Sequence, residues 1–330
     1  MTVVLSKSVV VAAVSVICAL HLLVNVVLNF REAMPAVKRI FAGLLAVGCV
    51  GVTTLSYKLH RMRASEYHTR RSMFDQYVVF SVMSLLGSYK RKKLEAATKK
   101  VKDVQDKILL ERLAYNAETE YGKRFHFSEI KTREDFKRLH PLTRYDHYKD
   151  YVDRIAKGEE NVITKDRPKI LALTSGTSGN ASMLPTIQKQ FSAFFLQGIT
   201  VCFDSLFTGY PTAKQLQRDL KLFYSPKPRT SESGIPVGPN SSSPASSKGL
   251  LNLYSTPEAG FGIMTEPEAL YVHLLFALRD RNLGMIEANF ASLVYMAFVA
   301  LSKHWKQLVE DIERGYIDPK LNITDEIEPN

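Results

Sequence analysis

The segment that decides the expected fold is Leu171-Ala172-Leu173-Thr174-Ser175-Gly176-Thr177-Ser178-Gly179, which Met183-Leu184-Pro185-Thr186 follows. The apolar start predicts a short strand that ends in a loop rich in glycine and hydroxyl groups. Glycines let the backbone turn its N–H groups toward one point, and the four hydroxyl side chains add donors, which suits a polyphosphate. The alternative is an ordinary surface turn. No Gly-Lys-Ser/Thr follows, so this is not a Walker A loop.

The composition predicts a folded chain without a disulfide framework. Of the 330 residues, 45% are hydrophobic, which is enough for a core in one large domain or two small ones. Cys18, Cys49 and Cys202 have no paired spacing, so neither disulfides nor a cysteine zinc site are indicated, and Cys202 is expected in the core. The histidines are scattered, and the sequence predicts no metal site in the protein itself.

The positive charge is confined to the N-terminal third. Residues 1–110 hold 17 Lys and Arg against 6 Asp and Glu, whereas residues 111–330 hold 27 of each. The C-terminal part is therefore neutral, and this argues against a nucleic-acid-binding domain.

The excess charge flanks two apolar runs, Val9–Leu28 and Ile40–Leu55. The first has the length of a membrane-spanning helix, and a cleaved signal peptide is the alternative. We expect residues 1–57 to form a membrane anchor of one or two transmembrane helices. Basic residues after the second run favour a cytoplasmic C-terminal part, and the expected location is the membrane of the endoplasmic reticulum.

Residues 58–93 are expected to form a basic juxtamembrane segment. Its apolar stretch Tyr77–Leu86 is too short to span and would lie in the membrane interface or pack into the domain. Lys90-Arg91-Lys92-Lys93 and further lysines up to Lys107 follow at helical intervals. They fit either a patch for anionic lipid head groups or a solvated helix face.

The remaining chain predicts alternating helices and strands. We expect helices over 94–117, with Tyr121-Gly122 at the C-cap, and over 191–207, 266–278 and 289–314, with Gly315 as the cap of the last helix. Ser128 and Thr132 are candidate N-caps, and strands are expected before Thr174 and over 250–254. Residues 225–248 contain eight serines and five prolines and predict a long loop. In the last helix, Leu293, Ala297, Leu301, Trp305 and Leu308 have core-facing spacing.

The region from about residue 94 to 325 resembles the GH3 family of acyl-acid amido synthetases. The motifs that carry the resemblance include Tyr121-Gly122-x-x-Phe125, Pro141-Leu142-Thr143-x-Tyr145, Tyr151-x-x-Arg154-Ile155, Gly158-Glu159, Thr174-Ser175-Gly176-Thr177-Ser178-Gly179, Tyr254-Ser255-Thr256-Pro257 and Phe290-Ala291-Ser292. The N-terminal anchor is more similar to the animal branch than to the plant enzymes.

The resemblance implies an α/β fold: residues 94–330 would be the N-terminal part of the large domain of the acyl-adenylate-forming superfamily. ATP, with Mg²⁺, would activate a small carboxylic acid to an acyl-adenylate, and an amino acid would then form the amide. Thr174, Ser175, Gly176, Thr177, Ser178 and Gly179 would hold the ATP phosphates. Phe290, Ala291 and Ser292 would lie near the acyl pocket, with helix core as the alternative. Catalytic residues are not identified.

Two departures from the family pattern leave a second function open. Family loops usually carry a Lys shortly before the Met-Leu-Pro element, whereas this chain has Asn180-Ala181-Ser182. The family pattern also continues beyond residue 330, so we expect a fragment that is inactive alone. The alternative to an enzyme is a catalytically inactive binding or scaffold protein of the same fold at a membrane.

Overall fold

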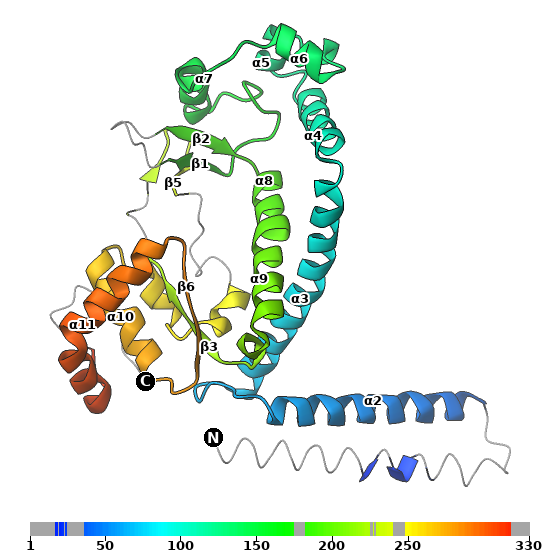
Figure 1. Ribbon diagram of the computed structural model, residues 1–330, viewed down its shortest axis with the longest axis vertical. Coiled ribbons are helices and arrows are strands. Elements are labelled where there is room, and N and C mark those ends of the chain that lie inside the picture. The colour runs from blue at the N-terminus through cyan, green and yellow to red at the C-terminus, as the bar shows by residue number, and fades with distance from the viewer. Residues whose placement is uncertain are drawn as a thin grey trace.

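The computed structural model describes residues 17–18, 20–22, 24, 36–174, 182–224, 227, 229–239 and 248–317. Within these ranges, helices surround a four-stranded sheet and a two-stranded sheet, which lie at different heights in Figure 1. Helices α3 (Arg70–Thr98) and α4 (Val101–Tyr115) run along one side of the molecule from one sheet to the other.

Helix α2 (Ala36–His60) covers the second apolar run. Its segment Ile40–His60 has the length and composition of a membrane span, and none of it is buried in the protein. Residues 17–18, 20–22 and 24 of the first run are helical, and the rest of that run lies outside the described residues. The number of spans in residues 1–57 therefore stays a prediction.

Helix α3 begins 24 residues before the helix expected at residue 94. Thr69 caps it, because its hydroxyl group accepts a hydrogen bond from the Ser72 N–H. The helix breaks at Lys99 and Lys100, and α4 follows. Phe80 and Met83 are buried, so the apolar stretch of the juxtamembrane segment packs partly into the domain.

Short helices follow α4: α5 (Glu120–Arg124), a 3₁₀ turn (Phe127–Glu129), α6 (Arg133–Leu139) and α7 (Asp146–Ala156). Tyr121 and Gly122 lie inside α5, so their expected role as a C-cap is wrong. Thr132 caps α6 as its sequence position predicts, with Asp135 completing a capping box. Ser128 lies inside the 3₁₀ turn, so its predicted role as an N-cap is wrong. Gly158 ends the region with φ of 103°, a conformation that glycine adopts without strain.

The four-stranded sheet has the order β2-β1-β5-β4. Its strands are β1 (Ile170–Leu173), β2 (Met183–Thr186), β4 (Arg229–Thr230) and β5 (Pro236–Gly238). β1 pairs antiparallel with β2 and parallel with β5. The expected loop over 225–248 is thus wrong in part: residues 229–238 form a hairpin, and Ile235 is buried against Leu171 and the helices α4–α7.

The expected apolar helix over 191–207 is confirmed as a longer helical column. It consists of α8 (Gln188–Ala193), a π-helical turn (Phe194–Ile199) and α9 (Thr200–Gly209). This column also has the length and composition of a membrane span, but Thr200, Asp204 and Phe207 are buried and α9 packs against α3. Cys202 is exposed, so its expected place in the core is wrong.

The two-stranded sheet is a parallel pair, β3 (Arg218–Leu222) and β6 (Leu283–Ala288), which α10 (Glu266–Leu278) connects. Helix α10 has the predicted bounds, and its apolar faces fill the largest core cluster together with α11 (Ala291–Arg314). The strand expected over 250–254 is wrong, because Lys248–Leu253 forms a 3₁₀ helix; a second 3₁₀ segment covers Glu258–Gly262.

Helix α11 ends at Gly315, which has φ of 74°, as the sequence predicts. Ala297 and Leu308 are buried in the core that α10 shares, and Leu293 and Leu301 pack against it. Trp305 is 52% exposed, so its predicted core position is wrong. An apolar spacing of three and four residues marks a broad face of the helix, and Trp305 lies at its solvent margin.

Candidate functional site

The hydroxyl-rich loop joins β1 to β2. Leu173 pairs with Met183 at the end of the antiparallel ladder. Beyond this pair, the Thr174 N–H donates to the Ser182 carbonyl oxygen over 3.0 Å, and the Ser182 N–H donates to Oγ1 of Thr174 over 3.3 Å. Residues 175–181, which include the predicted phosphate-binding residues Ser175, Gly176, Thr177, Ser178 and Gly179, lie outside the described residues. The expected strand and the start of the loop at Thr174 are confirmed.

Tyr145 holds the outer edge of this hairpin. Its hydroxyl group accepts a hydrogen bond from the Met183 N–H over 2.9 Å and donates one to the Met183 carbonyl oxygen over 3.1 Å. β2 is the last strand of its sheet, and an edge strand presents unpaired backbone groups. A side chain from the segment before α7 thus satisfies both backbone groups of the residue where the loop re-enters the sheet.

A polar cluster lies on the other sheet, where the sequence analysis identified no strand. Lys221 of β3 pairs with Glu287 of β6, directly across the parallel ladder. Asp219 lies two residues from Lys221 and is 2% exposed. Burial raises the pKa of the Asp219 carboxyl group well above its usual range, and the charge on Glu287 adds to this effect. The alternation of polar and apolar residues over 219–222 was the signal for this strand.

Among the described residues, Oε2 of Glu287 is buried without a hydrogen-bond partner. Glu287 is the last residue but one of β6, so this atom lies near the carboxyl end of the parallel pair. In open α/β sheets, ligands bind at the carboxyl ends of the strands. The end of β6 and the start of α11 are therefore the second region in which a ligand is expected.

Residues 90–329 match the profile of the GH3 family N-terminal domain. The chain belongs to the GH3 family. Its similarity to curated members includes 28% identity over 239 residues to the 4-substituted benzoates-glutamate ligase GH3.12 of Arabidopsis thaliana, covering 68% of this chain and 40% of that protein. The indole-3-acetic acid-amido synthetase GH3.3 of the same plant is 29% identical over 241 residues, covering 69% of this chain and 40% of that protein.

A solved GH3 structure agrees with this assignment. The GH3.15 acyl acid amido synthetase superposes with a TM-score of 0.63 at 25% identity and covers 70% of this chain and 41% of its own. The predicted GH3 membership and α/β fold are thus confirmed. The chain spans about two fifths of the length of these relatives. The likeness of the anchor to the animal branch stays a prediction.

Several GH3 motif residues build the support of the loop rather than the loop itself. The Tyr121 hydroxyl group lies 2.6 Å from Nε2 of His140 and 3.0 Å from Nε2 of His147. Arg154 forms a bidentate pair with Glu120 and also contacts Glu159. These contacts join α5, α6 and α7, and α7 follows directly after Tyr145. These motif residues are distant from the hydroxyl loop in sequence, but they hold together the short helices next to Tyr145, which contacts the loop end at Met183.

The three residues predicted near the GH3 acyl pocket lie where β6 ends and α11 begins. Phe290 is the N-cap residue of α11, makes no side-chain capping bond and is 72% exposed. Ala291 and Ser292 are also exposed, so the alternative reading as helix core is wrong for all three. Within the described residues no hydrogen bond or ion pair joins them to Thr174, and their role stays a prediction.

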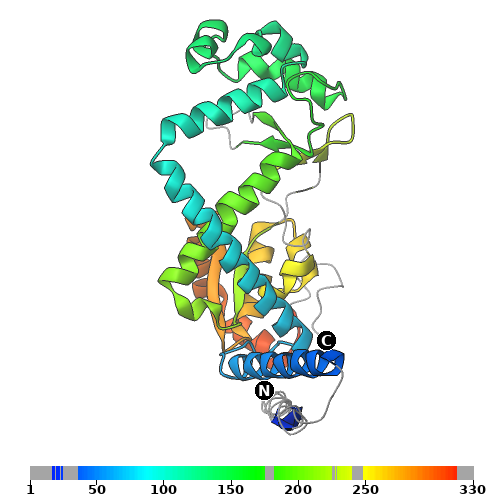
Figure 2. The same ribbon diagram turned by 90° about the vertical axis from the view of Figure 1, so that its right-hand side faces the viewer.

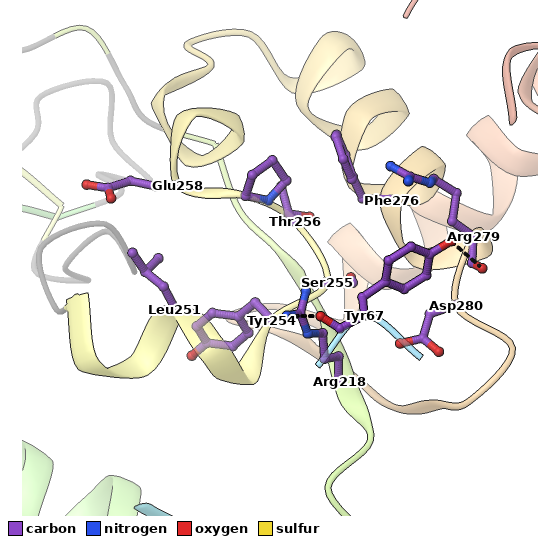
Figure 3. Close-up of a pocket in the computed structure, with 11 residues that line it drawn as sticks. Tyr67, Arg218, Leu251, Tyr254, Ser255, Thr256, Glu258, Phe276, Arg279 and Asp280 are labelled. Atoms are coloured by element: carbon purple, nitrogen blue, oxygen red, sulfur yellow. Dashed lines mark hydrogen bonds between the residues drawn. The ribbon is translucent and has the colours of Figure 1, made fainter. Parts of the chain in front are cut away.

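A pocket of about 350 Å³ lies elsewhere, at the amino end of β3. Its lining includes Tyr67, in the segment after α2, and Phe276 and Arg279 at the end of α10 (Figure 3). The Arg279 guanidinium lies 5.0 Å from the Tyr67 ring centroid and 5.4 Å from that of Phe276. Arg218 donates to the Tyr67 carbonyl oxygen over 3.0 Å. The pocket thus lies between the segment after α2 and the domain, at the end of the parallel strand pair opposite to Phe290.

Proposed function

We propose that this chain is the N-terminal portion of an ATP-dependent acyl-acid amido synthetase. The carboxylate of a small acid attacks the α-phosphorus of ATP, forms an acyl-adenylate and releases pyrophosphate. The amine of an amino acid then attacks the acyl carbon and releases AMP. The relatives named above are a ligase of 4-substituted benzoates with glutamate and an indole-3-acetic acid-amido synthetase, and this supports the substrate classes.

The observation that carries the proposal is the β1–β2 hairpin with the loop Thr174–Gly179 at its turn. Catalysis of adenylation depends on positioning and on stabilising charge at the phosphoryl group. The loop N–H and hydroxyl groups would bind the phosphates, and Thr174 is exposed at the mouth of the hairpin. Tyr145 would fix the return strand, and Phe290–Ser292 would contact the acyl group.

Mg²⁺ would enter with the nucleotide. Within the described ranges, no three His, Cys, Asp or Glu side chains gather into a metal site. The ion would offset the charge of the pyrophosphate leaving group.

The proposal includes a membrane anchor in residues 1–57, with the GH3 domain on the cytoplasmic side of the endoplasmic reticulum. The exposed apolar segment Ile40–His60 supports it, because 21 residues of helix are long enough to cross the hydrocarbon core. The basic residues Lys58, Arg61 and Arg63 at the end of α2 support the cytoplasmic side. Membrane lipid is thus one proposed partner.

Replacement of two loop hydroxyl groups tests nucleotide binding. The double variant Thr177→Ala, Ser178→Ala removes donors to a charged acceptor, each worth about 1.5–3 kcal/mol. We expect ATP affinity, measured by calorimetry on the detergent-solubilised chain, to fall at least about tenfold. Ser192→Ala, an exposed hydroxyl on α8, is the control. Equal affinity in the double variant would show that the loop is only a turn.

The neutral segment Asn180-Ala181-Ser182 favours a second candidate, a GH3-fold protein that binds ligand without turnover. One electrostatic contact to a developing charge is worth about 10²–10³ in rate. Carboxylate-dependent exchange of pyrophosphate into ATP separates the two functions. Exchange by the protein that contains this chain would establish the synthetase; ATP binding without exchange, over a panel of carboxylic acids, would establish the binding protein.

A further inference from the structure

Helix α3 has an apolar stripe on the face that points away from the domain. Phe74, Val78, Val82, Leu85 and Tyr89 follow one another at intervals of four, four, three and four residues, which places them in one row along the helix. Their exposed fractions lie between 40% and 77%, with Leu85 the highest. We refer to these five residues as the outer stripe.

The opposite face of α3 is the one that the domain buries. Its buried residues include Gln76, Phe80, Met83 and Gly87, and the helix packs there against α9. Figure 2 shows α3 nearer to the viewer than α9, so the outward face of α3 is the one seen in this view. The outer stripe is therefore not a core face of the described domain.

Basic residues flank the outer stripe at both ends. Helix α3 contains six Lys and Arg against two acidic residues, Asp75 and Glu95. Both carboxylates lie beside an arginine, because Asp75 is 3.9 Å from Arg71 and Glu95 is 4.0 Å from Arg91. Exposed apolar residues with cations beside them are typical of a helix that lies in the interface of an anionic bilayer.

Helix α2 projects toward the same side. In Figure 1, α9 lies on one side of α3 and α2 extends from the base of α3 toward the other side. Figures 1 and 2 both show α3 rising steeply from the level of α2. If α2 crosses the membrane, α3 lies along the membrane surface and not along its normal.

The segment between α2 and α3 is attached to the domain, which fixes this arrangement. Ser65 donates a hydrogen bond to the Asp280 carboxylate and is buried. The Tyr67 carbonyl oxygen accepts from Arg218, and the Tyr67 hydroxyl group donates to the Arg279 carbonyl oxygen over 3.2 Å. These three contacts attach residues 65–67 to the domain. Lys58 of α2 also donates a hydrogen bond to the Tyr77 hydroxyl group of α3 over 3.3 Å, so the end of α2 contacts α3 directly.

We infer that the outer stripe of α3 lies on the lipid surface, as a second membrane contact beside α2. Its apolar side chains would enter the boundary between head groups and acyl chains, at a depth of about 5–10 Å. Arg70, Arg71, Lys92 and Lys93 would contact anionic head groups. This rests on the proposed anchoring by α2, and it gives the GH3 domain one fixed face toward the membrane.

Fluorescence quenching by brominated lipid tests the inference on the full chain. Trp305 is the single tryptophan, so Trp305→Phe provides a background for Leu85→Trp. The control is Leu142→Trp in the same background, because Leu142 is fully exposed in the segment between α6 and α7. Both proteins are placed in nanodiscs of brominated phosphatidylcholine with or without phosphatidylserine, and circular dichroism checks their folding.

We expect Leu85→Trp to lose most of its emission in phosphatidylserine-containing nanodiscs, while Leu142→Trp keeps its emission. Equal emission of the two would overturn the inference and would show that water or another protein surface covers the stripe. If Leu85→Trp does not fold, Val82→Trp provides a second tryptophan in the outer stripe for the same quenching measurement. Carbonate extraction of native membranes tests the anchor separately: release of the chain would refute anchoring by α2, whatever the quenching shows.

Discussion

Gly87 of α3 lies directly against the backbone of Thr200 in α9. A Cβ atom on Gly87 would come within 2.2 Å of the Thr200 carbonyl oxygen, which is far closer than any real carbon contact. One turn further on, Arg91 donates to the Asp204 carboxylate over 2.7 Å. The close approach of the two helices therefore depends on the missing side chain at residue 87.

Replacement of this glycine is the first test of the fold. Gly87→Ala should lower the free energy of unfolding by about 1–3 kcal/mol, because α3 or α9 must move to admit the methyl group. Thermal unfolding of the detergent-solubilised chain measures the effect. Gly209→Ala is the matched control, since that helical position has nothing within 4 Å of the added carbon. Equal midpoints for the two variants would disprove the close packing.

Tyr145→Phe tests the support of the hydroxyl loop. The substitution keeps the ring but removes the group that satisfies both backbone groups of Met183. We expect faster amide hydrogen exchange at Met183, and ATP affinity lower by about 1–2 kcal/mol, that is, roughly five- to thirtyfold. Tyr210→Phe, at an exposed tyrosine after α9, is the control. Unchanged amide hydrogen exchange at Met183 would show that Tyr145 does not stabilise the end of the loop.

The lowered pKa of His273 predicts how the stability of the fold depends on pH. Its ring is fully buried, with Nε2 at the Phe223 carbonyl oxygen and Nδ1 at the Thr256 hydroxyl group over 2.9 Å. Burial lowers the pKa of His273 to about 4 from an ordinary value of 6.5. Between these values the unfolded chain binds a proton that the folded chain does not. Stability from this group is therefore complete above pH 6.5 and is lost as the pH falls toward 4.

The loss should approach about 3 kcal/mol near pH 4. His273→Gln can make both hydrogen bonds without titrating, so its unfolding free energy should fall less over this range. Asp219 acts in the opposite direction, because its raised pKa favours the folded state at low pH. The difference between wild type and His273→Gln isolates the histidine. Parallel curves for the two proteins would contradict the assignment.

Three glycosylation sequons test the orientation of the domain. They begin at Asn180, Asn240 and Asn322, and exposed acceptors of this type are often glycosylated in the secretory lumen. We expect no shift in mobility after glycosidase treatment of the chain from eukaryotic cells. Protease digestion of intact microsomes should remove the domain. Glycans together with protection from protease would place the domain in the lumen and contradict a cytoplasmic ATP site.

The features that could be predicted from the sequence are those that neighbouring residues encode. The bounds of α10, the cap at Thr132, the end of α11 at Gly315 and the strand before Thr174 all followed from local pattern. Apolar periodicity, capping hydroxyl groups and glycine φ preferences act within a few residues, so they can be read along the chain. The GH3 motifs likewise gave the family, because they stand in a fixed order.

Which surfaces meet depends on contacts between segments that are distant in sequence. Tyr145 reaches Met183 across 38 residues, and no local pattern predicts a side chain that closes the edge of a strand. Residues 229–238 became a hairpin because β1 offered them a parallel partner, although their composition favoured a loop. Both faces of α3 carry apolar residues. Packing against α9 buries one face, and the other stays exposed. Burial is a property of the assembled fold, since it depends on segments that are far apart in sequence.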